Sequence, residues 1–222
     1  MQILVLEHER YAPAGLLEDW ARERGHTLRV LEVPTLQRWP APASADAVVS
    51  LGSESSVHAE PPPWVARELE FLRLAHSQQV PAFGICFGAQ ALAAALGGQV
   101  RRGSELAVEW SPLDTHERAL IPQGPWLRWH EDVFTVPPGA RALASTRAVT
   151  LAFAVGRSVG VQFHPEADAA IARSWIAGSR HRLAERAGEL EALHGRMQAE
   201  ARAARGRALE LFDRIAAHWT QR

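Results

Sequence analysis

The fold of this chain is decided by residues 80–90, which read Val-Pro-Ala-Phe-Gly-Ile-Cys-Phe-Gly-Ala-Gln. The apolar part up to Ile85 has the length of a buried strand, and the alanine-rich run that continues to Leu96 has helical character. Cys86 therefore stands at a strand-to-helix turn, with one glycine two residues before it and another two residues after it. Such a turn brings backbone against backbone, which only small neighbours allow. This is the layout of a nucleophile elbow.

The alternative for Cys86 is a buried structural cysteine, a common role for a lone cysteine. Because glycine makes up about 7% of residues, two glycines flank a given cysteine in this way by chance only about 0.5% of the time. A sulfur at a helix N-terminus is also favoured as the thiolate. The Phe87 N–H would point at the oxygen that becomes negative during acyl transfer. We therefore interpret Cys86 as a nucleophile.

A second motif, Val-Gln-Phe-His-Pro-Glu, occupies residues 161–166. His164 follows an apolar strand that Pro165 ends, and Glu166 is close enough to hold one imidazole nitrogen. A cysteine nucleophile needs a base of this kind, oriented by a third group. The carboxyl ends of parallel strands meet at one edge of a sheet, so Cys86 and His164 are expected there together. The alternative is a strand-end histidine beside a solvated carboxylate.

The rest of the chain alternates between apolar strands and helical stretches. That order predicts an α/β fold with an open, mainly parallel sheet and helices on both faces. Strands are expected over residues 3–6, 27–33, 46–51, 80–85 and 159–163, and helices over residues 14–24 and 64–77.

Two regions depart from this alternation. Between residues 99 and 160, short β-prone pieces are separated by Pro, Gly and charged turns, which predicts hairpins added to the sheet. From Ala167 onward the chain is rich in Ala, Arg and Glu and is expected to be helical. We divide it into a domain at residues 1–178 and a C-terminal helical extension at residues 179–222. The extension is expected to pack on that domain; docking of a second subunit or another partner is the alternative.

Composition excludes several classes of protein. With 47% hydrophobic and 22% charged residues, the 222-residue chain is neither disordered nor membrane-like. A formal net charge of −1 gives no reason to expect nucleic acid as a partner. One cysteine cannot form an internal disulfide, and no apolar run reaches the length of a membrane span. We expect a cytoplasmic protein that needs no metal and no other cofactor.

The pairing of Gly-Ile-Cys-Phe-Gly-Ala-Gln with Gln-Phe-His-Pro-Glu about eighty residues later resembles the class I glutamine amidotransferases. Within that family, residues 1–178 are most similar to stand-alone proteins like the amidotransferase domain of GMP synthase. The resemblance implies a flavodoxin-like amidotransferase fold. It also implies that Cys86 attacks the side-chain amide of glutamine to form a glutamyl thioester. His164 would protonate the departing ammonia and then activate water, with Glu166 orienting its ring.

The resemblance suggests roles for three further segments. Gly52 lies in the loop that supplies the second oxyanion donor beside Phe87, although residues 52–56 contain less Gly and Pro than that loop usually does. Gln90 matches a residue that lines the glutamine pocket. The segment 129–133 resembles one that touches the amino-acid end of the substrate; a packed Trp beside polar turn residues is the alternative. The substrate-binding candidates in that segment are His130, Glu131 and Asp132.

Three functions follow from these motifs. The first is a glutaminase that passes ammonia to a synthetase subunit, since no segment of this chain resembles an ammonia acceptor. The second is a hydrolase of another γ-glutamyl amide, without ammonia channelling. The third, least favoured, is a non-catalytic binding module. The expected partners are glutamine or a γ-glutamyl amide, a synthetase subunit, and a second copy of the chain.

Overall fold

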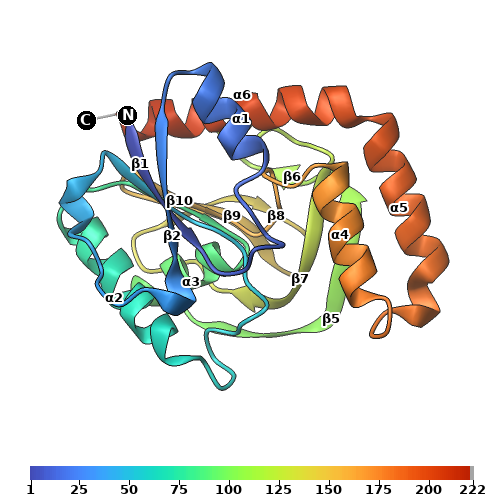
Figure 1. Cartoon of the computed structure of the whole chain (residues 1–222), viewed down its shortest axis with the longest axis horizontal. Helices are drawn as coiled ribbons and strands as arrows, with labels where there is room; N and C mark the ends of the chain where they lie inside the picture. Colours follow the sequence, from blue (N-terminus) through green and yellow to red (C-terminus); the bar gives the residue numbers. More distant parts are fainter. Residues whose placement is uncertain (221–222) are drawn as a thin grey trace.

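The computed structural model describes residues 1–220, arranged around an eight-stranded sheet (Figure 1). The first five strands in spatial order run parallel to one another, and each of the last three runs antiparallel to the strand before it. This confirms the open, mainly parallel sheet. In spatial order the strands are β2 (Thr27–Glu32), β1 (Gln2–Glu7), β3 (Ala47–Ser50), β4 (Ala82–Ile85), β10 (Ser158–Val161), β9 (Thr150–Val155), β8 (Arg141–Ser145) and β6 (Asp114–Thr115).

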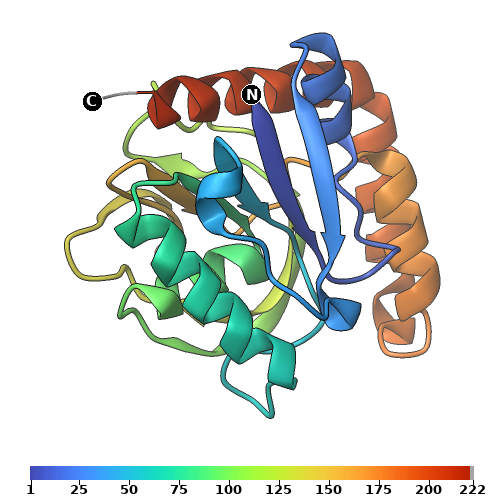
Figure 2. The same cartoon turned by 60° about the vertical axis from the view of Figure 1, so that its left-hand side comes forward.

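Helices cover both faces of the sheet, as expected for continuously apolar central strands. In Figure 1, α1 (Leu16–Glu23) and α6 (Ala201–Trp219) lie above the sheet, and α2 (Pro63–Ser77) and α3 (Phe87–Ala95) lie below it. Figure 2 brings α2 and α3 to the front. Successive side chains of β1 point to opposite faces of the sheet. Val5 packs with α1 and α6 on one face, and Leu4 packs with α2 and α3 on the other. Burial on both faces therefore explains the apolar runs.

The expected hairpins form in two places. Strands β8 and β9 pair antiparallel and extend the main sheet. By contrast, β5 (Val100–Ser111) and β7 (Trp126–Phe134) pair with each other in a separate two-stranded sheet. An isolated bridge between Leu127 of β7 and His164 connects this ribbon to the segment after β10. The apolar side chains Val108, Trp110 and Leu127 of this ribbon pack on α4 (Ala169–Ser179) and α5 (Ala187–Ala199). The ribbon thus has its own helical cover, which is why it does not join the main sheet.

The C-terminal helices pack against the rest of the chain. Leu211 and Phe212 of α6 lie in the core between the sheet and the helices α1 and α6. Trp20 of α1 donates to Asp213 of α6 at 2.8 Å. Apolar side chains of these helices are buried within the chain, as the exposed fractions of 2% for Leu190 and 0% for Leu211 illustrate. A domain boundary at residue 178 falls in the last turn of α4 and stays a prediction; residues 221–222 lie outside the described residues.

Three 3₁₀ turns complete the description: η1 (Val33–Thr35), η2 (Pro42–Ser44) and η3 (Ala184–Arg186). Within residues 1–220, no helix combines the length and the apolar character needed to cross a membrane.

Candidate active site

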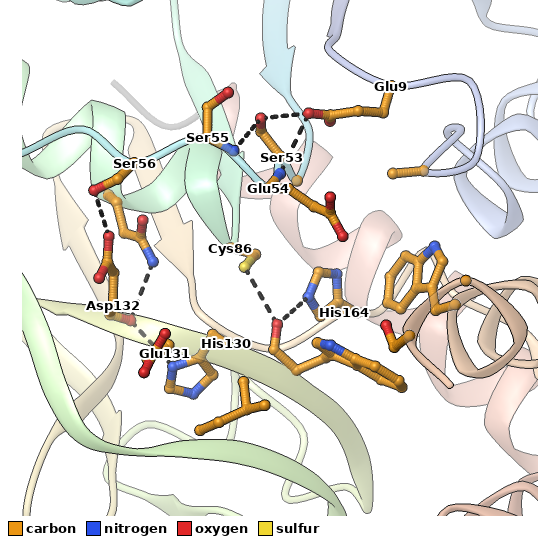
Figure 3. A pocket seen from close by; sticks show the side chains of 18 of the residues that line it. Glu9, Ser53, Glu54, Ser55, Ser56, Cys86, His130, Glu131, Asp132 and His164 are labelled. Atoms are coloured by element: carbon orange, nitrogen blue, oxygen red, sulfur yellow. Dashed lines mark hydrogen bonds between the residues drawn. The ribbon is translucent and has the colours of Figure 1, made fainter. Parts of the chain in front are cut away.

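A cavity of about 740 Å³ opens at the carboxyl edge of the parallel strands (Figure 3). Three neighbouring strands deliver polar or reactive residues to it. Gly52 follows β3, Cys86 follows β4, and His164 follows β10. Because β4 lies between β3 and β10, the topology places the sulfur between the glycine loop and the imidazole. This is the crevice where open α/β sheets bind ligands.

Cys86 adopts the strained backbone conformation of a nucleophile elbow, with φ 53° and ψ −106°, directly before α3. The flanking glycines are required by close backbone approach. A Cβ on Gly84 would lie 2.4 Å from the Gly88 carbonyl oxygen, and one on Gly88 would lie 2.0 Å from the Ser50 carbonyl oxygen. The turn is fixed by the Cys86 N–H, which donates to Val161 O on β10 at 2.8 Å. The local sequence therefore dictates where the sulfur stands.

Replacing Gly88 by alanine is expected to destabilise the fold by about 3 kcal/mol or more, because backbone must move to admit the new methyl group. Urea unfolding measures the effect. Gly195→Ala is the matched control: Gly195 lies in α5 with nothing within 4 Å of an added Cβ, so it should stabilise by up to about 1 kcal/mol. A Gly88→Ala protein destabilised by less than about 1 kcal/mol, the low end of what overpacking costs, would contradict this account of the turn.

His164 and Glu166 meet side by side beneath the cavity. The imidazole Nδ1 donates to Glu166 Oε1 at 2.7 Å, and both side chains are buried. On the opposite side of the ring, Nε2 donates to the backbone oxygen of Trp129 at 3.3 Å. The Cys86 sulfur lies 3.8 Å from the same oxygen, so sulfur and Nε2 converge on one carbonyl (Figure 3). The structure thus brings Cys86, His164 and Glu166 together in the expected order.

The charge state of His164 follows from these neighbours. Burial alone would lower the pKa of His164, but the Glu166 carboxylate and Cys86 outweigh it and raise this pKa well above its usual value. Geometry agrees, because both ring nitrogens face acceptor oxygens and must both carry protons. A protonated imidazole beside the sulfur is the partner that a thiolate requires.

The Gly52 loop closes the cavity over this pair. A Cβ on Gly52 would lie 3.3 Å from His164 Cε1 and 3.9 Å from Cys86 Cβ, so a side chain here would crowd the imidazole by a few tenths of an ångström. The other predicted oxyanion donor, Phe87, is the first residue of α3. Its ring is fully buried in the core, which leaves its backbone N–H as the group available to the site.

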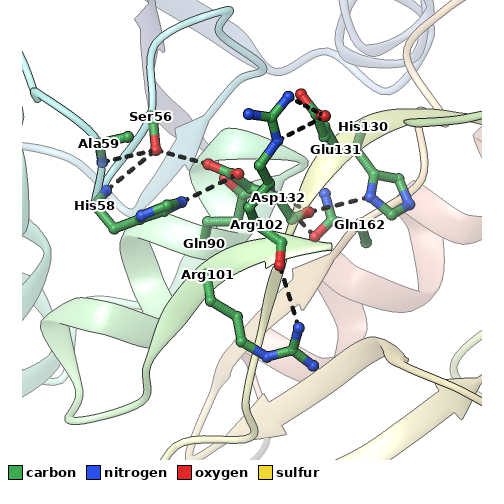
Figure 4. A network of polar contacts seen from close by, with 10 residues as sticks. All are labelled: Ser56, His58, Ala59, Gln90, Arg101, Arg102, His130, Glu131, Asp132 and Gln162. Atoms are coloured by element: carbon green, nitrogen blue, oxygen red, sulfur yellow. Dashed lines mark hydrogen bonds and ion pairs between the residues drawn. The ribbon is translucent and has the colours of Figure 1, made fainter. Parts of the chain in front are cut away.

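The remaining predicted residues gather on the far side of Cys86 from His164 (Figure 3), and Figure 4 shows the polar contacts among them. Gln90 Nε2 and His130 Nδ1 both donate to the Asp132 carbonyl, at 3.1 Å each. The Asp132 carboxylate accepts from Ser56 Oγ at 2.7 Å and from His58 Nε2 at 3.2 Å.

Two of these residues have their own distinctive surroundings. Glu131 pairs with Arg102 at the rim, at 2.5 Å. Burial lowers the pKa of His130 to about 4, so its ring is neutral at physiological pH. Among residues 1–220, His130 Nε2 has no hydrogen-bond partner. Gln90, His130, Glu131 and Asp132 therefore line one arm of the cavity together.

Sequence reasoning missed several side chains of the site. Gln162 donates to the Cys86 sulfur at 3.5 Å and accepts from Gln90 at 3.3 Å. It precedes His164 by two residues, and this spacing placed both on one face of the chain, so the motif contained a signal for it. Trp175 of α4 packs edge-on against His164 with ring centres 4.8 Å apart. No pattern in the sequence indicated this contact. Among the described residues, no group of three or more His, Cys, Asp or Glu side chains could hold a metal.

Comparisons with known proteins identify the family of this chain. The family model of class-I glutamine amidotransferases matches residues 16–176. A curated relative, the glutamine-hydrolysing GMP synthase of Thermus thermophilus, is 40% identical over 98 residues, which cover 40% of this chain and 20% of the relative. The corresponding enzyme of Allorhizobium ampelinum is 27% identical over 163 residues, or 68% of this chain and 30% of the relative. The matched part therefore spans only about a third or less of these relatives.

Solved structures cover the chain more completely. A glutamine amidotransferase from Thermotoga maritima superposes with a TM-score of 0.87 at 25% identity, over 97% of each chain. One from Methylobacillus flagellatus has the same TM-score of 0.87 at 18% identity, over 100% of this chain and 96% of the other, and supports the fold alone. The family match extends over well more than half of the sequence and includes both Cys86 and His164. The chain belongs to the class-I glutamine amidotransferase family.

Proposed function

We propose that this chain hydrolyses the side-chain amide of glutamine through a thioester on Cys86. The observation that carries the proposal is the hydrogen bond from His164 to Glu166 together with the approach of His164 Nε2 and the Cys86 sulfur to one carbonyl oxygen, at a strained elbow that opens into the cavity. Family membership and the glutamine-hydrolysing relatives support the choice of substrate.

In the first half of the reaction, the Cys86 sulfur attacks the amide carbon, and any proton on the sulfur passes to His164 Nε2. The amide oxygen becomes negative and accepts hydrogen bonds from the Phe87 and Gly52 N–H groups. As the carbon–nitrogen bond breaks, His164 Nε2 gives its proton to the departing ammonia. The glutamyl group is left as a thioester on Cys86.

In the second half, water enters the position that ammonia has left. His164 Nε2 takes a proton from this water as its oxygen attacks the thioester carbon. The carbon–sulfur bond then breaks, which releases glutamate and restores the free Cys86 sulfur. Throughout, Glu166 accepts from Nδ1 and keeps Nε2 directed at the reacting groups.

The amino-acid end of glutamine is proposed to occupy the arm lined by Gln90, His130, Glu131 and Asp132. This arm lies across Cys86 from His164, so a substrate bound there would present its amide nitrogen toward the imidazole (Figure 3). Ammonia is proposed to pass to a synthetase subunit, as the GMP synthase relatives suggest.

The shape of the cavity favours a second candidate, cleavage of a larger γ-glutamyl amide. Beyond His164 the cavity continues along α4 and the segment after it, where Trp175, Ser179 and Arg182 line it together with Tyr11. Since His164 has to protonate the leaving nitrogen, this second arm lies on the side of the leaving group. It offers room for an amine larger than ammonia.

Steady-state glutamate release by the purified chain distinguishes the two candidates. We expect glutamine to be cleaved with a kcat in the range of about 1–10 s⁻¹. Asparagine, one methylene shorter, should not be cleaved, because its amide cannot reach the sulfur from the same arm. A kcat/KM at least about tenfold higher for γ-glutamyl anilide, equivalent to about 1.4 kcal/mol, would move the assignment to the second candidate. No glutamate from either substrate, and no adduct with a glutamine-like electrophile, would contradict both.

A further inference from the structure

A buried ion pair outside the triad lies directly beneath the Gly52 loop. His8, just after β1, donates from Nε2 to Glu68 Oε2 of α2 at 2.8 Å. The second Glu68 oxygen accepts from Ser50 Oγ at 2.6 Å. Glu68 is 0% exposed, and the His8 ring is enclosed by Trp64 and Phe87 at centre distances of 5.0 and 4.9 Å. The proposed triad does not use this pair.

The other nitrogen of His8 reaches the proposed oxyanion loop. His8 Nδ1 donates to the Gly52 carbonyl oxygen at 3.2 Å. Both ring nitrogens therefore face acceptors, which requires a doubly protonated imidazole. Burial alone would lower the pKa of His8, but the Glu68 carboxylate outweighs it and this pKa is raised. Burying two charges is costly, so filling this space would not by itself call for such a pair.

Gly52 is held on both sides by these contacts. The carbonyl of Leu51 before it accepts from the Gly88 N–H at 3.1 Å, and its own carbonyl accepts from His8. The Gly52 N–H shares a peptide plane with the Leu51 carbonyl, whereas the Gly52 carbonyl belongs to the next peptide. Because glycine has more freedom of rotation than any other residue, the loop keeps one conformation at Gly52 only if both peptides are fixed. The side chains that Gly52 faces are those of His164 and Cys86.

We propose that the His8–Glu68 pair is a positioning device for the oxyanion hole: by holding the Gly52 carbonyl, it fixes the peptide after Gly52 and so keeps the loop, with its Gly52 N–H, in place beside the acyl oxygen. Glu68 and Ser50 orient the imidazole, and His8 transmits that orientation to the loop. The inference rests on the proposed function. Displacing a donor by about 1 Å can cost about 10²-fold in rate.

The test compares two variants, each of which keeps a substitute for only one of the two ring nitrogens of His8. The Nδ2 of asparagine can replace Nδ1, whereas the Nε2 of glutamine can replace Nε2. Both replacements are made together with Glu68→Gln, which avoids leaving an unpaired buried carboxylate. Relative to H8N/E68Q, the variant H8Q/E68Q should lose about 10²-fold in kcat for glutamine, since it lacks the contact to Gly52. KM should differ by less than about threefold, because the binding arm is untouched. Alkylation of Cys86 by iodoacetamide should proceed at equal rates in both.

A control and a second measurement keep the outcome decisive. His218→Asn removes a buried histidine bond to the Gly156 carbonyl, 3.0 Å long and far from the cavity, and should lower the melting temperature without changing kcat. Equal kcat values for the two double variants, or kcat values that merely follow melting temperature, would overturn the positioning role. If the double variants do not fold, ¹⁵N NMR of the wild-type histidines decides: an unprotonated Nδ1 on His8 cannot donate to Gly52 and would overturn the proposal. Absence of wild-type turnover would instead count against the proposed function.

Discussion

Glutamine turnover is expected to fall by at least about 10⁴-fold when Cys86 is replaced by serine. A hydroxyl is nearly isosteric with the thiol, so the strained turn between Gly84 and Gly88 should persist. The hydroxyl is a far weaker nucleophile, however, and the imidazolium of His164 cannot stabilise it as it stabilises a thiolate. The measurement is steady-state glutamate release, accompanied by thermal unfolding to show that the variant is folded.

Labelling provides the companion measurement. The chain has a single cysteine, so a glutamine-like electrophile should add one adduct to the wild type and none to Cys86→Ser. Mass spectrometry of the intact protein reports both results without ambiguity over the site. Full turnover by the serine variant, or an adduct on it, would end the proposal of a thioester on Cys86.

Glu166→Gln is expected to lower kcat by about 10⁴-fold while leaving the fold in place. The amide nitrogen of glutamine can donate to His164 Nδ1, which moves the remaining proton of the ring to Nε2. The ring could then no longer take a proton from Cys86 or water. Because the Glu166 carboxylate helps to raise the pKa of His164, its loss should lower that pKa. The protonated ring would then be lost at lower pH, so the alkaline limb of the residual kcat/KM profile should move to lower pH.

An exposed ion pair supplies the control for this variant. Glu191 on α5 pairs with Arg173 at 3.1 Å at the surface, and Glu191→Gln should change kcat by less than about twofold. Retention of more than a tenth of the wild-type kcat by Glu166→Gln would show that the carboxylate does not set the tautomer of His164. An unchanged pH profile would lead to the same conclusion.

The sequence predicted the parts of this protein that depend on near neighbours along the chain. Cys86 stands at the turn between β4 and α3 because Gly84 and Gly88 permit backbone contact there. Glu166 reaches His164 because only two residues separate them along the chain. The parallel direction of β1, β3 and β4 could be predicted too, since each strand is apolar on both faces and helical stretches follow β1 and β3.

The strand pairing of the hairpin region could not be predicted from neighbours along the chain. The pattern of apolar and polar residues over residues 100–134 is the same whether this segment extends the main sheet or forms a separate two-stranded ribbon. Only the packing of α4 and α5 on Val108, Trp110 and Leu127 decides between these outcomes. The helical extension itself was evident from composition, but its role as cover for this ribbon and for the α1 face was not.

The sequence by itself determined the elbow at Cys86, the His164–Glu166 contact and the mainly parallel sheet, because each follows from local spacing or from repeated burial along a strand. Only the assembled fold brings the Trp129 carbonyl to the Cys86 sulfur and the His8–Glu68 pair to Gly52. The physical reason is separation along the chain. Residues 44 and 60 positions apart become neighbours only when strands and helices assemble, and no local pattern records which polar groups then face each other.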